Sequence, residues 1–149
     1  MNPQGIDFAA CLEVLVDYPS GVAGGAISDM WFDITWASAK LGLHQPGAVE
    51  HLMRAARAAD QLHALHAFDI VLRFLAIAAA EAGLGEHAHA LVAYSEANLR
   101  QHRMENPQQT WAQGRLDELF AGFPKPASEA ALARGEIMRT ISEIEGALT

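Results

Sequence analysis

Hydrophobic and polar positions recur with helical spacing along nearly all of this 149-residue chain. Met30, Ile34 and Leu41 follow one another at spacings of four and seven residues, so they share one face of a helix expected at 28–40 and its C-terminal end. The stretch 68–82 is apolar nearly all round, which predicts a helix buried on most sides at the centre of the domain. No run shows the strict alternation typical of a strand. The pattern therefore predicts an all-α protein.

Glycine- and proline-containing stretches divide the chain into about six to seven predicted helices. A break at Gly135 is expected in the last one, with a restart at the capping-box pattern that begins at Thr140. Three regions follow: an N-terminal helix with a glycine-rich linker (1–25), helical hairpins (26–122) and C-terminal capping helices (123–149). The expected helices span 6–18, 28–40, 47–64, 68–82, 86–103, 107–121 and the residues from 128 onward.

The hairpin region contains a weak internal repeat. A small residue, a large residue and a second small residue occur at spacings of four and three, which places them on one packing face of a helix. The same spacing recurs 42 residues apart, and the Gly-Leu turns before the two sets are 41 residues apart. Two copies of one helical hairpin indicate a repeat scaffold. The two sets are Ala48, Leu52 and Ala55, and Ala90, Tyr94 and Ala97.

Charge and cysteine content exclude several classes of function. The formal net charge is −8 and the ten Lys and Arg residues form no run, so direct nucleic-acid binding is not expected. Cys11 is the single cysteine, which excludes an internal disulfide and suits a reducing compartment. No apolar stretch approaches the roughly 20 residues of a membrane span, and no basic region precedes an apolar run as in a signal peptide. A cytoplasmic protein without membrane contact is expected.

Histidine is the residue type that most suggests a metal site. A pair one helical turn apart could place two ring nitrogens on one metal ion, with two aspartates nearby. A site needs three or four ligands, however, and no HExxH or CxxC pattern completes the set. Surface histidines near turns are the more common explanation, so no metal or other cofactor is predicted. The residues considered are His63, His66, Asp60 and Asp69, and then Glu86, His87 and His89.

Other candidate chemistry also has a structural explanation. The Gly21–Gly25 stretch lacks the lysine and hydroxyl of a phosphate loop, and Cys11 lacks the neighbours of a nucleophile. Trp31, Trp36 and Trp111 could line a ligand groove. Core packing is the preferred role of these rings, above all for Trp36, with Trp111 expected to be half exposed. We expect no enzyme activity.

Two segments resemble a known family. The stretch 84–97 (LGEHAHALVAYSEA) resembles the turn and second helix of a tetratricopeptide repeat, although the 42-residue offset exceeds the usual 34. The stretch 131–148 (ALARGEIMRTISEIEGAL) resembles the C-terminal helical region of bacterial LuxR-type signal-transduction ATPase regulators. There the repeats end in a motif similar to AxAxGxxM, matched by Ala131, Ala133, Gly135 and Met138. The chain departs from this motif at Leu132, where an aromatic is usual, and at Glu136, where a basic residue is usual.

The resemblance implies a non-enzymatic interaction or sensor segment, without the ATPase and helix-turn-helix modules of such regulators. Under the repeat alignment Leu72, Leu75 and Ala79 face the concave side. Because all three are apolar, the groove would take an apolar helix or be covered by another copy of the chain. The expected partner is a protein, a peptide or a small effector, and self-association is a further expectation. Two alternatives stay open, a small helical metal-binding protein or enzyme that uses the histidines, and a truncated gene fragment.

Overall fold

The computed structural model describes residues 7–10, 13, 25–103, 105–122 and 133–149. Residues 8–10 are helical, but most of the helix expected at 6–18, including Cys11, lies outside the described residues, as does most of the glycine-rich stretch. The described chain contains helices and no strand, so the predicted all-α class is confirmed. The helices are α2 (Ala26–Gly42), α3 (Ala48–Leu62), α4 (Leu65–Glu81), α5 (Gly85–Asn98), the 3-10 helix η1 (Arg100–His102), α6 (Pro107–Phe120) and α7 (Arg134–Leu148).

Local sequence explains several of the helix ends. Gly83 follows α4 with a φ of 85°, a conformation that costs glycine little. The Leu84 amide donates to the Ala79 carbonyl at 2.8 Å and the Gly83 amide to the Ala80 carbonyl at 3.1 Å, which is a Schellman ending. At the start of α6, the Asn106 side chain accepts from the Gln109 amide at 2.9 Å. The turn at Gly83 therefore returns the chain on itself and produces the hairpin α4–α5, and α2 and α3 pack together as a second hairpin.

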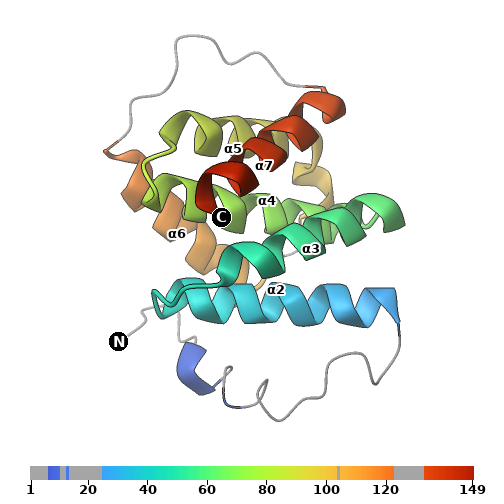
Figure 1. The fold of residues 1–149 in the computed structure, drawn as a ribbon, viewed down its shortest axis with the longest axis vertical. Coiled ribbons are helices and arrows are strands. Elements are labelled where there is room, and N and C mark those ends of the chain that lie inside the picture. Colours follow the sequence, from blue (N-terminus) through green and yellow to red (C-terminus); the bar gives the residue numbers. More distant parts are fainter. Residues whose placement is uncertain (1–6, 11–12, 14–24, 104, 123–132) are drawn as a thin grey trace.

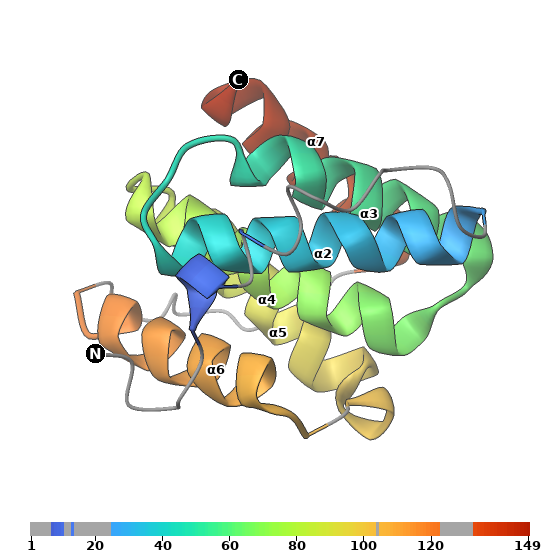
Figure 2. The ribbon, with the colours of Figure 1, turned by 90° about the horizontal axis from the view of Figure 1, so that it is seen from below.

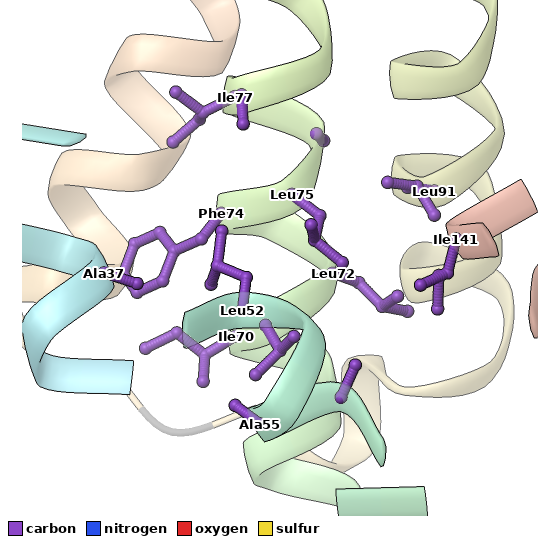
Figure 3. Packing of buried hydrophobic residues seen from close by; sticks show 14 of the residues in the cluster. Ala37, Leu52, Ala55, Ile70, Leu72, Phe74, Leu75, Ile77, Leu91 and Ile141 are labelled. Carbon is purple, nitrogen blue, oxygen red and sulfur yellow. The ribbon is translucent and has the colours of Figure 1, made fainter. Parts of the chain in front are cut away.

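Helix α4 runs through the middle of the molecule, with α2, α3, α5 and α6 packed against it (Figures 1 and 2). Every residue from Ala67 to Ala80 is buried. This agrees with the prediction of a central helix that is apolar nearly all round. Phe74 points from α4 toward Ala37 of α2 (Figure 3).

The expected packing faces differ between the two hairpins. In α3, all three members of the set are buried: Ala48, Leu52 and Ala55. In α5, Tyr94 is buried and Ala90 is partly buried, but Ala97 is exposed. The expected α5 face is therefore corrected at Ala97, because the buried row of this helix is centred on Ala88, Leu91 and Ser95, with Tyr94 at its edge.

Helix α7 also differs from the expectation. It runs without a break from Arg134 to Leu148, so the predicted interruption at Gly135 is wrong. Gly135 lies in the first turn, where its low helix propensity has little effect. The Thr140 hydroxyl donates to the Glu136 carbonyl at 3.0 Å, as in a helix interior, so Thr140 does not start a new helix. None of the described helices is long and apolar enough to cross a bilayer.

Candidate functional site

A charged network lies inside the molecule between α4, α5 and α6. Its centre is Asp69, one turn before Arg73 on α4, and these two side chains are 0% and 2% exposed. Charged groups are rarely this deeply buried unless they are paired. Such a pair inside an otherwise apolar helix is the sequence signal for the network, since both residues need partners from neighbouring helices.

The Asp69 carboxylate accepts from three other residues. Arg103 donates to it through Nε at 3.0 Å and through Nη2 at 3.1 Å, in a bidentate pair. Gln109 of α6 donates at 3.2 Å, and the Ser95 hydroxyl of α5 also donates to the carboxylate. The hydrogen bond to Asp69 raises the pKa of Arg103 despite partial burial. In the sequence Asp69 stands out only as a neighbour of His66, whereas in the structure it joins α4, α5 and α6.

The Arg73 guanidinium is held on the same side of α4. Nη1 lies 3.3 Å from Glu96 Oε1, and Nη2 donates to Gln113. Burial lowers the pKa of Arg73, and the nearby Arg103 lowers it further. Burial disfavours ionised Glu96, but hydrogen bonds and charge from Arg103 and Arg73 outweigh it and lower the pKa of Glu96. Two carboxylates and two guanidinium groups thus balance in charge and connect α4 to the elements around it.

A second polar cluster connects α2 to α3 near the surface. Asp33 Oδ1 lies 2.8 Å from His51 Nδ1 and 2.9 Å from Arg54 Nη2. The His51 ring stacks on Trp36 at 5.6 Å between centroids, and Lys40 Nζ lies 3.4 Å from His51 Nε2. Burial opposes ionisation of Asp33, but the bonds from His51 and Arg54 outweigh it and lower the pKa of Asp33.

Both ring nitrogens of His51 are engaged. Nδ1 lies 2.8 Å from Asp33 Oδ1 and 2.9 Å from Arg54 Nη2, and Nε2 lies 3.4 Å from Lys40 Nζ. An imidazole oriented by a carboxylate is used as a general base when Nε2 faces a nucleophile. Here Nε2 faces Lys40, and the Ser38 hydroxyl donates to the Thr35 carbonyl at 2.9 Å. The cluster therefore fastens the first hairpin, and the contacts shown assemble no nucleophile on His51.

The histidines considered for a metal site lie apart or are engaged elsewhere. His63 and His66 are both exposed; His63 ends α3 with a φ of 52°, and the His66 ring lies 5.4 Å from the Trp31 ring. His87 Nε2 lies 3.1 Å from Glu143 of α7, and the His89 ring stacks on Phe120. Across the described segments, no group of three or more His, Cys, Asp or Glu side chains could hold a metal ion.

The tryptophans pack as partly buried rings. Trp111 lies 5.1 Å from Phe8 and 6.2 Å from Phe74, so it joins α6 to α4 and to the N-terminal helical residues. Trp36 lies beneath His51 and Lys40. All three tryptophans therefore take part in packing between elements, and none lines an open groove in the contacts described.

The residues expected to line an apolar groove do not lie at an open surface. Leu72, Leu75 and Ala79 are all 0% exposed, which corrects the expectation of an accessible groove at these positions. Leu72 points toward Leu91 of α5 and Ile141 of α7 (Figure 3), and the three belong to one buried cluster. The chain's own C-terminal helix thus covers this side of the hairpins.

Helix α7 rests on a surface formed by α3 and α5 with α4 beneath them, which we call the α7 seat. Its polar rim consists of Arg57, Asp60 and His87, and its apolar floor includes Leu72 of α4 and Leu91 of α5. Three isoleucines of α7 are buried, at positions i, i+4 and i+7: Ile137, Ile141 and Ile144. This apolar stripe is visible in the sequence, but the stripe alone does not say which surface it covers.

Ion pairs surround the buried isoleucines. Arg57 Nη2 donates to both Glu145 oxygens at 2.8 Å, and Arg134 Nε donates to Asp60 at 2.8 Å. With the His87–Glu143 contact, these pairs place two acidic side chains of α7 near Arg57 and His87 of the seat. The seat is therefore apolar in the middle and has charges of both signs at its rim.

A small, open pocket of about 340 Å³ lies where α5 meets η1. It is lined by Ala97, Asn98, Arg100 and Gln101, so it offers amide and guanidinium donors beside apolar surface.

Comparison of the chain with protein-family models, curated proteins and solved structures finds no match.

Proposed function

We propose that this chain is a non-enzymatic helical-hairpin module that binds a protein partner. Its role would resemble that of the tetratricopeptide-like segment in LuxR-type ATPase regulators. One observation carries the proposal: an amphipathic helix is received in an apolar seat between two stacked hairpins. Reception of a helix through anchors at i, i+4 and i+7 is a common mode of helix recognition.

The polar clusters support a binding role over a catalytic one. The two carboxylates and two guanidinium groups of the buried network balance in charge across helices, and His51 is engaged by Asp33, Arg54 and Lys40. These groups stabilise the surfaces on which a partner could dock. The single cysteine suits a reducing compartment, and we place this role in the cytoplasm. The pocket where α5 meets η1 is a second place at which an effector could bind.

Photo-crosslinking in cell extract tests this function. The full chain would carry the photoreactive group at Leu62 or at Ile27, the large apolar side chains most exposed among the described residues. We expect a crosslinked protein that contains an ATPase module or belongs to a transcription regulator. A matched group at Glu118, an exposed polar position, should give less of the same product. Products shared equally by all three positions, or the absence of a regulator among them, would contradict the proposal.

Metal titration tests the histidine-based alternative. A scaffold should show no rise in Tm with zinc or iron at micromolar concentration. A rise that disappears in His63→Ala or His66→Ala would overturn the scaffold proposal in favour of a metal-binding protein.

A further inference from the structure

Resting on the proposed binding function, we infer that the α7 seat is an interaction surface for a partner helix with the pattern of α7. The partner chemistry is set by contacts in the structure. It would carry three branched aliphatic side chains at i, i+4 and i+7, and acidic side chains at i+6 and i+8. Helix α7 is then the chain's own occupant of this surface.

The connection of α7 to the remaining helices differs from the others. Turns of two to five residues join α2 to α3, α3 to α4 and α4 to α5, whereas thirteen residues separate α6 from α7. Helix α7 packs on α3 and α5, which precede it by more than thirty residues. Helix α7 is therefore held on α3 and α5 by side-chain contacts and not by a short connection.

The contacts of α7 also favour exchange. Its burial depends on Ile137, Ile141 and Ile144, whereas α4 is buried from Ala67 to Ala80. The ion pairs of α7 lie at the surface, where such pairs contribute little: the side chains of Arg57, Arg134 and Glu143 are 42–57% exposed. A second helix with the same stripe could replace all of these contacts.

Charge complementarity selects the partner and its orientation. Glu145 meets Arg57, Glu143 meets His87, and Arg134 meets Asp60. A partner helix would need its acidic residues toward one end and a basic residue toward the other. When α7 leaves, Leu72 and Leu91 lose the cover of Ile141, and the apolar surface expected from the sequence becomes accessible (Figure 3).

Peptide binding to the full chain tests the inference. The receptor is the full-length Ile137→Glu/Ile141→Glu variant, in which the chain's own helix is unseated, and the probe is a fluorescent peptide of residues 134–149. We expect this peptide to bind the variant at least tenfold more tightly than it binds the wild-type chain. The same peptide with Ile141→Glu, which matches it in length and forms a helix at least as readily, should bind at least tenfold more weakly. Equal or absent binding of the two peptides to a cooperatively folded variant would overturn the inference.

Hydrogen exchange on the wild-type chain keeps the inference testable if the variant fails to fold. The α7 amides should exchange at least tenfold faster than the α4 amides under native conditions, through a separate opening. Exchange of both helices in a single global event would show that α7 is an integral part of the fold and would overturn the inference. A wild-type dimer that exchanges its α7 helices, detected by sedimentation with and without peptide, would identify a second copy as the occupant and overturn the partner-helix assignment.

The two proposals fail in different ways. If the peptide does not bind but a regulator is crosslinked at Leu62, the proposed function remains and is exerted through another surface. Peptide binding without any regulator among the crosslinked proteins keeps the seat but removes the regulatory role.

Discussion

Replacing Asp69 tests whether the buried network holds α4, α5 and α6 together. Asp69→Asn keeps the side-chain shape but removes the charge that faces the bidentate Arg103. The new amide group must also lie among the donors of Ser95, Arg103 and Gln109. Removing one partner of a buried ion pair costs about 3–5 kcal/mol, because the other charge is left without compensation. Arg103 is 18% exposed, so we expect the lower end, about 3 kcal/mol.

Urea unfolding followed by circular dichroism measures this loss. For a chain of this size, about 3 kcal/mol corresponds to a fall in Tm of roughly 6–12 °C. The matched control is Glu118→Gln, which also changes an acid that pairs with an arginine, but at a side chain that is 71% exposed. We expect the control to cost less than about 1 kcal/mol. If the two variants lost the same stability, the network would not be the structural centre described above.

Three other predictions concern packing, pH and the rim of the seat. Leu72 is fully buried, so Leu72→Ala should lower the free energy of unfolding by about 2–5 kcal/mol in urea titrations, whereas Leu62→Ala at the surface should lower it by under about 0.5 kcal/mol. Similar losses at both positions would contradict the burial of Leu72. The pKa of Glu96 is lowered in the folded state, so ionised Glu96 contributes to stability above the ordinary pKa of 4.5, and this contribution is lost as the pH falls below 4.5. The urea midpoint should therefore decline with acid more steeply in the wild type than in Glu96→Gln, and equal slopes would refute this. Arg57→Glu should speed the hydrogen exchange of the α7 amides several-fold, because the new carboxylate would repel Glu145, and the added substitution Glu145→Arg should return the exchange rate to that of the wild type. If the α7 amides exchanged as fast in the double variant as in Arg57→Glu, the pair would not hold α7.

Local patterns in the sequence were enough to predict much of the fold. The apolar run through Ile70–Ile77 predicted a central helix, and Gly83 and Asn106 mark helix ends that the structure contains. These features depend on residues close together in the chain. Periodicity and capping therefore predicted them without knowledge of the tertiary structure.

The candidate site depends on distant residues, which single-chain patterns do not pair. Asp69 and Gln109 are 40 residues apart, and Arg57 and Glu145 are 88 residues apart. The stripe of Ile137, Ile141 and Ile144 predicts an apolar face, but α7 could have extended an open array instead of covering α3 and α5. The same ambiguity explains why Leu72 was expected at an accessible surface, since the covering helix comes from the far end of the chain.

The exposed Ala97 shows a related limit. Spacing places Ala90, Tyr94 and Ala97 on one side of a helix, but it does not decide how far the inward face turns. In α5, the inward row includes Ser95, whose hydroxyl donates to Asp69. A polar contact in the core therefore helped to orient a helix whose apolar pattern was weak.

Methyl nuclear Overhauser contacts between the α7 peptide and the full-length Ile137→Glu/Ile141→Glu variant test the central claim most directly. We predict contacts from Ile141 of the labelled peptide to Leu72 and Leu91 of the chain, as the intact molecule places these side chains (Figure 3). Peptide contacts to other methyl groups, or none to Leu72 and Leu91 while the chain is folded and the peptide is in excess, would contradict the claim that the seat receives a helix.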